Sequence, residues 1–403
     1  MKDLLSAREA AALLDVKAAT LYSYVSRGLL ASAPGTHGPS RLYARVDVER
    51  LRARHVARAG HGAVAAGALR FGEPVLESAL TCIDDEGPRY RGHSAVALAT
   101  SRASFESVAE LLWTGARGDE APSFPSVARL PELQRFVPRG APPIAALSLV
   151  VPALSLGDPW RFDAPPAEEL ERARRLVRAL ASAVAFAYDA RRLRASLRAP
   201  SVAGALALAL GVAATPRTRA ALDRALVLSA DHELNPSSFA ARVAASTGAD
   251  LYACVGVALG ALSGPEHGGA CERIEALVTE IGAPERAATV IEERTRRGDA
   301  LPGFGHPLYP AGDPRAVPLL RAASPRNRAG RTLAALVARM RTARREPPNV
   351  DLALVATALS LRLPPGAASA IFAVGRAAGW IAHALEQRAA GFVLRPRARY
   401  VGP

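Results

Sequence analysis

Apolar residues recur every three to four positions along most of the chain, a period that predicts a mainly helical protein. From about residue 69 onward, Ala- and Leu-rich stretches of roughly 10 to 20 residues are separated by Pro and Gly, as in a succession of helices. Helices are predicted over residues 168–191, 220–228 and 240–262. Near residues 74–91 the pattern changes, and it predicts a hairpin instead.

The first 58 residues have their own pattern and predict a small separate domain. Ser6 and Glu9 have the spacing of a capping box, which opens a short helix. A second helix is predicted over residues 18–27, a short strand over residues 41–43, and a third helix from Asp47 to about His55. Two short helices joined by a tight turn, then a basic wing and another helix, are typical of a winged helix-turn-helix domain.

The segments AREAAALLDVKAATLYSYVSRGLL and RLYARVDVERLR resemble the MerR/excisionase type of DNA-binding domain. The resemblance implies that the second helix enters a major groove, with Lys17, Thr20, Ser23, Arg27 and Arg41 as candidate DNA contacts. The alternative interpretation is a small helical domain used for protein–protein packing, because a fold does not fix a function. Residues 59–68, rich in Ala and Gly, are predicted to form a linker.

Composition narrows the class of protein. Half of the 403 residues are hydrophobic, which excludes a disordered or collagen-like chain. The longest apolar run, residues 203–214, is too short to cross a bilayer and predicts a core helix, so we expect no membrane partner. Cys82, Cys254 and Cys271 form no CxxC pair, which argues against a disulfide scaffold or a zinc module and suits a reducing cytoplasm. We expect no secretion signal at the N-terminus.

The net charge of +14 suggests anionic partners. A basic surface attracts nucleic acid, but it also attracts anionic metabolites, and composition alone does not choose between them.

Several ionisable residues stand where a plain helical core would not accommodate them. His232 lies in the segment DHELNP between two apolar helices, where consecutive polar groups must be paired or exposed. His267 lies in GPEHGG, just before a helix predicted over residues 270–281. The oriented N–H groups of that helix end favour a neutral imidazole ring, and Gly268 and Gly269 are expected to leave room for a ligand. Taken alone, each segment also fits a solvated turn.

Three further segments have the same character. His306 lies in the loop PGFGHP, whose glycines and prolines set its path, and Asp313 and Arg315 follow shortly after it. Asp351 follows PPNV and is expected to be the N-cap of the helix over residues 352–361. Arg376 lies in a helix that is apolar on nearly all sides, where a charge is costly unless it meets an anion or a core acid.

These motifs, in this order, resemble the citrate synthase family. The matching segments are RYRG, SFESVAELLWTG, DHELNPSSFAARVAAST, GPEHGG, PGFGH followed by DPRA, PPNVD, FAVGRAAGWIAH and RPRARYVGP. The resemblance covers residues 69–403 and implies an all-α citrate synthase fold behind the winged helix-turn-helix domain. It also implies a large domain (about 69–265 and 360–403), a small domain (about 266–359), a homodimer, and an active site in the cleft between the domains.

The resemblance also assigns roles to individual residues. His267 resembles the donor of a hydrogen bond to the thioester oxygen, Asp351 the base that removes the α-proton of the acyl-CoA, and His306 the group that polarises the ketone. The oxaloacetate-binding set it implies is His232, Arg315, Arg376, and Arg395 lent across the dimer interface. No cofactor beyond the acyl-CoA co-substrate is implied, and no metal site.

The chain departs from the family pattern where the CoA moiety is expected. Many members have Ala-Asn after HGG, whereas this chain has Ala270 and Cys271. Many bacterial members have Arg-Val-Tyr-Lys after GFGH, whereas residues 307–310 here read Pro-Leu-Tyr-Pro and lack the basic residues. Candidate substitutes for meeting the CoA phosphates are Arg294, Arg296, Arg297, Arg344 and Arg345.

The sequence therefore favours a cytoplasmic acyltransferase of the tricarboxylic acid cycle that condenses acetyl-CoA with oxaloacetate to citrate. A close alternative is a 2-methylcitrate synthase that uses propionyl-CoA, because one methylene is worth only about 1–3 kcal/mol in a pocket. A second alternative is a DNA-binding regulator whose body senses a metabolite. The presence of Asp351 favours the enzyme, because a sensor needs the arginines but not the base.

Overall fold

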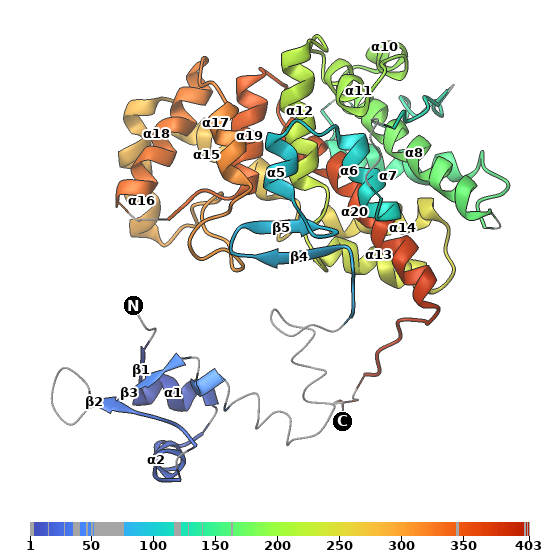
Figure 1. Cartoon of the computed structure of the whole chain (residues 1–403). Helices are drawn as coiled ribbons and strands as arrows, with labels where there is room; N and C mark the ends of the chain where they lie inside the picture. Colours follow the sequence, from blue (N-terminus) through green and yellow to red (C-terminus); the bar gives the residue numbers. More distant parts are fainter. Residues whose placement is uncertain are drawn as a thin grey trace. The chain divides into compact units, whose positions relative to one another are not determined.

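The structure is a computed structural model. It describes residues 4–14, 16–27, 29–34, 41–45, 47–49, 51, 76–116, 122–127, 129–138, 140–162, 164–343, 346–398, 400 and 402. The chain forms two compact units, Met1–Glu77 and Ser78–Pro403, which are considered separately (Figure 1). The predicted linker at 59–68 lies outside the described residues, as do Arg344 and Arg345.

The N-terminal unit combines a small antiparallel sheet with two helices. Its elements are β1 (Leu4–Ser6), α1 (Ala7–Leu14), α2 (Ala18–Ser26), β2 (Ala33–Pro34) and β3 (Arg41–Ala44), and the strand order is β1-β3-β2. The predicted capping box is confirmed, because Glu9 Oε2 accepts the Ser6 N–H at 2.8 Å and Ser6 Oγ accepts the Glu9 N–H at 3.3 Å. These bonds fix the start of α1 directly after β1.

Buried side chains from each part of this unit form one core. They include Leu14, Leu21, Leu30, Tyr43 and Val48. Residues 47–49 and 51 are helical, as predicted, and the rest of the third helix falls outside the described residues. Two helices, a wing made by β2 and β3, and a further helical segment reproduce the predicted winged helix-turn-helix pattern.

The larger unit is built around one helix, α20 (Ala367–Ala390), which runs through the middle of the others (Figure 1). The helices that contact it are α6 (Phe105–Thr114), α7 (Pro143–Ser155), α8 (Pro166–Ala183), α12 (Pro216–Ser229), α13 (Pro236–Ser246), α14 (Leu251–Leu262), α15 (Ala270–Ile281) and α19 (Val350–Ser360). By length and composition α20 is apolar enough to cross a membrane. However, 89% of its apolar window is buried inside the protein, which is typical of a core helix.

The remaining helices complete the unit. They are α5 (Ala95–Thr100), α9 (Ala185–Tyr188), α10 (Leu193–Leu197), α11 (Val202–Ala209), α16 (Ala287–Arg297), α17 (Ala316–Ala322) and α18 (Arg328–Ala343). Helices α15 to α19 gather on one side (Figure 1) and correspond to the predicted small domain. The division into large and small domains stays a prediction.

The predicted hairpin precedes the helices. It consists of β4 (Thr81–Asp84), β5 (Gly87–Tyr90) and the short β6 (His93–Ser94), in the order β4-β5-β6. The Tyr90 hydroxyl donates to the carbonyl of Val227 at 3.0 Å and lies 3.2 Å from the carbonyl of Asp231. The hairpin therefore holds the C-terminal end of α12 and the loop after it in place.

Three helix predictions need correction. The single helix expected over residues 240–262 is two helices, α13 and α14, because Gly248 adopts a φ of +80° and Asp250 caps α14 by accepting the N–H of Ala253 at 2.7 Å. The helix expected over residues 168–191 is α8, which ends at Ala183, followed by the short α9; the helical stretch stops at Tyr188, because Asp189 is extended and caps a 3₁₀ turn, Ala190–Arg192. The core helix expected over residues 203–214 is α11, which ends before Gly211 (φ +86°).

Candidate active site

Two loops that carry predicted site residues are joined by their backbones. Gly305 donates its N–H to the carbonyl of Pro347 at 2.9 Å, and Asn349 donates its N–H to the carbonyl of Gly303 at 2.9 Å. Gly303 has a φ of +94°, and a Cβ there would lie 3.0 Å from the Leu352 side chain, so glycine fits this position best. The pairing brings the loop of His306 to the start of α19.

Three aromatic rings then meet beside this junction. His232 Nε2 lies 2.8 Å from the Tyr309 hydroxyl, and the ring centroids of His232 and His306 are 5.3 Å apart. His306 and Tyr309 are also in contact, with centroids 4.9 Å apart. Burial first, and then the charges of Arg315 and Arg376, lower the pKa of His232 well below its ordinary value, so its ring is neutral.

His306 is held in one protonation form. Its Nδ1 accepts the N–H of Leu308 at 3.1 Å. Burial and the charge of Arg315 lower its pKa, which favours the neutral ring. Because Nδ1 is the acceptor, the proton of the neutral ring resides on Nε2, which is left to donate a hydrogen bond to a ligand.

Asp313 holds the guanidinium group of Arg315 in place. Its carboxylate accepts from Arg315 Nε at 2.9 Å and from Arg315 Nη2 at 2.8 Å, and it accepts the N–H of Val350 at 2.9 Å. Both side chains of this ion pair are at most 2% exposed. Burial alone would raise the pKa of Asp313, but the charge and hydrogen bonds of Arg315 outweigh it, and the pKa lies below its ordinary value. Arg315 is thereby fixed beside the first turn of α19.

Arg376 is buried in α20, as predicted, and is 2% exposed. Its Nε donates to the carbonyl of Ser229 at 2.7 Å, and its guanidinium lies over the Phe372 ring at 4.6 Å from the centroid. Within the described residues, no carboxylate pairs with it. Asp231 and Asp351 act on Arg376 only through their charge, so its guanidinium can pair with an anion from outside, for which a carboxylate is best suited.

His267 lies two residues before the N-cap of α15. Its Nε2 is 2.9 Å from the Ser237 hydroxyl, whose oxygen also accepts the indole N–H of Trp380 at 3.0 Å. Burial and then the charge of Arg376 lower the pKa of His267 to about 4, so this ring is also neutral at pH 7. A Cβ at Gly268 would meet the carbonyl of Leu262, so glycine is needed there for close backbone packing. The expected room for a ligand at Gly268 and Gly269 stays a prediction.

Asp351 lies in the first turn of α19, but it does not cap the helix. Asn349 is the N-cap, because its side chain accepts the N–H of Leu352 at 3.2 Å. Asn and Asp are comparably good caps, so the sequence alone did not separate them. The Asp351 carboxylate is therefore free for another role. Burial raises its pKa, against the lowering effect of Arg315 and Arg376, and the Sγ of Cys271 lies 3.9 Å from Oδ1.

Electrostatic interactions with two buried arginines show that these residues lie in one site. The charge of Arg376 acts on His232, His267 and Asp351, and that of Arg315 acts on His232, His306 and Asp351. The structure thus brings together six of the seven predicted catalytic and substrate-binding residues. Arg395 is not among them: it is exposed in the extended segment after α20.

A buried polar chain that sequence reasoning missed supports the loop of His232. Asp231 is fully buried and accepts from Thr81 Oγ1 at 2.6 Å, and its Oδ1 lies 3.3 Å from His383 Nε2. His383 Nδ1 accepts from Arg242 at 2.9 Å, and Arg242 pairs with Glu386. Tyr309, Ser237 and Trp380 were missed as well. The only sequence signal for them was their position inside or beside the motifs.

Two of the candidate CoA-binding arginines form ion pairs with acidic side chains of this chain. Arg294 and Arg297 both pair with Glu280, and Arg297 also pairs with Asp299 at 2.8 Å. Arg296 is exposed. Across the described ranges, no group of three or more His, Cys, Asp or Glu residues is placed to hold a metal ion.

The candidate DNA contacts lie on or at the ends of α2, and on β3. Lys17 and Arg27 are exposed at the two ends of α2, and Thr20 and Ser23 are partly exposed between them. Their spacing places them on one face of α2, whereas Leu21 points into the core. Arg41, on β3, donates to Ser32 Oγ at 2.8 Å.

Comparison with known proteins gives two family matches. The citrate synthase C-terminal domain matches residues 70–397, and a helix-turn-helix domain matches residues 4–56. Citrate synthase 2 of Bacillus subtilis is 41% identical over 190 residues, 45% of this chain and 51% of the relative, so this match spans about half the relative's length. The citrate synthase of Haloferax volcanii is 33% identical over 356 residues, 81% of this chain and 93% of the relative.

Further relatives and solved structures point the same way. The 2-methylcitrate synthase of Mycobacterium tuberculosis is 31% identical over 338 residues, 78% of this chain and 84% of the relative. Citrate synthase of Thermoplasma acidophilum, solved as a ternary complex with carboxymethyl coenzyme A and oxaloacetate, has a TM-score of 0.69 at 27% identity. The alignment covers 82% of this chain and 94% of that structure.

Proposed function

Because the chain belongs to the citrate synthase family, we propose that it condenses acetyl-CoA with oxaloacetate and hydrolyses the citryl-CoA intermediate to citrate and CoA. The observation that carries the proposal is the convergence of three neutral histidines, two buried arginines and one carboxylate with a raised pKa. A thioester α-proton is a weak acid, so its removal needs both a base and a stabiliser of the enol oxygen.

The carboxylates of oxaloacetate would meet Arg315 and Arg376, with His232 beside them. Arg376 supports this role because it has no carboxylate partner of its own among the described residues. In a homodimer, Arg395 would complete the set from the partner subunit, and its exposure leaves it available for this. A bidentate guanidinium–carboxylate pair fixes the orientation of the keto acid as well as its charge.

The reacting groups then have separate tasks. Asp351 removes a proton from the α-carbon of acetyl-CoA while His267 donates a hydrogen bond to the thioester oxygen. The resulting carbon nucleophile attacks the ketone carbon of oxaloacetate, whose oxygen receives a hydrogen bond from Nε2 of His306. This oxygen is protonated as the carbon–carbon bond forms, so that the proton count balances with the one removed by Asp351. A neutral imidazole suits both donor roles, and the low pKa of His267 keeps its ring neutral at pH 7. Water finally cleaves the thioester and releases CoA.

The test is the release of CoA thiol by the purified chain, with oxaloacetate and either acetyl-CoA or propionyl-CoA. We expect release that depends on oxaloacetate and falls by about 10²–10⁴-fold in Asp351→Asn, the range for loss of a general base. Asp299→Asn, a surface carboxylate, is the matched control. If neither acyl-CoA gives thiol release, the proposal is wrong.

The same assay separates the two named activities of the relatives. The resemblance to a 2-methylcitrate synthase supports propionyl-CoA as the alternative donor. The donor with the higher kcat/KM identifies the reaction, and the expected difference is set by how one methylene fits the pocket.

A second candidate function rests on the helix-turn-helix match. We propose that the exposed face of α2 contacts DNA through Lys17, Thr20, Ser23 and Arg27, with Arg41 on the wing. Binding of labelled duplex DNA should weaken in the Arg27→Gln variant and fall steeply with salt, because phosphate contacts release counterions. Duplex binding that is unchanged in Arg27→Gln would favour a packing role for this domain.

A further inference from the structure

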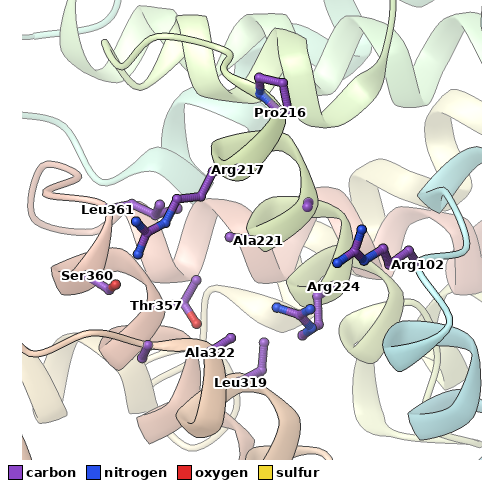
Figure 2. Close-up of a pocket in the computed structure, with 12 residues that line it drawn as sticks. Arg102, Pro216, Arg217, Ala221, Arg224, Leu319, Ala322, Thr357, Ser360 and Leu361 are labelled. Atoms are coloured by element: carbon purple, nitrogen blue, oxygen red, sulfur yellow. The ribbon is translucent and has the colours of Figure 1, made fainter.

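A cavity apart from the candidate active site lies between α12 on one side and α17 and α19 on the other. Its volume is about 420 Å³, within the usual range for small-molecule sites. Three arginines line it: Arg217 and Arg224 on α12, and Arg102 in the turn after α5 (Figure 2). None of the predicted catalytic or oxaloacetate-binding residues lines it.

The charges in this cavity are uncompensated. The guanidinium groups of Arg102, Arg217 and Arg224 form no hydrogen bond or ion pair with any residue that the structure describes; Arg102 and Arg217 are exposed and Arg224 is half-buried. None of the twelve lining residues in Figure 2 is acidic. Three guanidinium groups around one space repel one another, and an anion between them removes that repulsion. The N-terminal end of α12, where Pro216 and Arg217 lie, adds the positive end of a helix dipole.

The spacing indicates an elongated ligand. Arg217 and Arg224 are seven residues apart on α12, which places them on one face and about 10.5 Å apart along the helix axis. Figure 2 shows both side chains projecting toward the helices that hold Thr357 and Leu319. On that side, Ser360 Oγ accepts the N–H of Ser324 at 2.9 Å, which leaves its own hydroxyl proton to donate. A chain of two or three phosphate groups spans such a set better than a single anion does.

Each helix that lines the cavity has its other end next to the candidate active site. The carbonyl of Ser229 in the last turn of α12 holds Arg376, and His232 follows shortly after. Arg315 immediately precedes α17, and Asp351 lies in the first turn of α19. A ligand that draws α12 toward α17 and α19 would therefore also change the spacing of the active-site groups.

We propose that this cavity binds a small molecule other than the CoA substrate through a di- or triphosphate group, and that its occupancy alters oxaloacetate binding. The second part rests on the function proposed above, whereas the first does not. Inorganic tripolyphosphate, titrated calorimetrically into the full chain, is the probe. We expect saturable binding that weakens about tenfold or more in both Arg224→Gln and Arg217→Gln, as for the loss of a charged hydrogen-bonding partner.

Arg321→Gln is the matched control, because this exposed arginine on α17 removes the same charge without lining the cavity. It should bind within twofold of the unmodified chain. Repeating the titration with saturating CoA separates this cavity from a site for the CoA phosphates. Displacement by CoA, equal binding in all variants, or no binding would each overturn the proposal.

The coupling is tested separately in the thiol-release assay. Tripolyphosphate should change the KM for oxaloacetate several-fold in the unmodified chain and in Arg321→Gln, but not in Arg224→Gln, whose activity without the probe should be unchanged. Calorimetry reports binding even if the chain releases no CoA, so failure of the proposed function and failure of this proposal are distinguishable. Binding with an unchanged KM would refute the coupling.

Discussion

The buried ion pair of Asp313 and Arg315 gives a quantitative test of how the site is held. In Asp313→Asn the shape of the side chain is kept, but its charge is lost. One carboxylate oxygen becomes an NH₂ group, which then faces a donor, either the Arg315 guanidinium or the N–H of Val350. The variant therefore leaves Arg315 buried without a counter-charge.

The magnitude follows from the burial of both partners. With side chains 2% and 0% exposed, removal of one partner should lower the free energy of unfolding by about 3–5 kcal/mol. The effect also depends on pH. Because the folded pKa of Asp313 lies below its ordinary 3.8, the ion pair stabilises the fold above that value and stops doing so as pH falls through the folded pKa. The free energy of unfolding of Asp313→Asn should therefore fall less between pH 7 and pH 3 than that of the unmodified chain.

Urea unfolding at pH 7 and at pH 3, at equal protein concentrations, measures both effects. Asp299→Asn is the control, because Asp299 pairs with Arg297 at the surface, where the side chains are 46% and 55% exposed. We expect little or no change in the control. Equal losses in the two variants, or a loss below about 1 kcal/mol in Asp313→Asn, would refute the reasoning.

Three further predictions follow from single contacts. In Gly379→Ala the new Cβ would lie 2.4 Å from the carbonyl of Ala230, so the free energy of unfolding should fall by about 1–3 kcal/mol in urea and the KM for oxaloacetate should rise. Iodoacetamide should label only exposed Cys82 in the folded chain and also Cys254 and Cys271 in urea, as counted by mass spectrometry, because burial raises both thiol pKa values. Burial raises the pKa of Asp351 above 3.8, so the acid limb of kcat/KM should lie above that pH; a limb at or below it would contradict this.

Local sequence rules predicted the local parts of the structure. Ser6 and Glu9 form their capping box because both partners lie within one turn, and the hairpin over β4 and β5 closes through neighbouring residues. The resemblance of the motifs to the citrate synthase family was what implied that His306, Asp351 and Arg376 share a site. One local prediction was wrong: Asn349, not Asp351, is the N-cap of α19. Both residue types are good caps, so local rules did not separate them.

Long-range contacts were beyond the same rules. Tyr309 reaches His232 across 77 positions, and Thr81 reaches Asp231 across 150. Nothing in the residues around Thr81 indicates that its hydroxyl is buried against a carboxylate, because that depends on how the hairpin packs on the end of α12. The break at Gly248 was missed for another reason, since a glycine within an apolar run is compatible with a continuous helix as well as with a turn.

The central place of α20 has a consequence for how the chain is made. A ribosome synthesises α6, α7, α8, α12, α13 and α14 before it reaches α20, although all of them pack against that helix. Until residues 367–390 leave the exit tunnel, the nascent chain has apolar helix faces with no partner to cover them. The larger unit therefore completes its core only after α20 emerges, and earlier nascent chains are the species most prone to aggregate and most in need of chaperones.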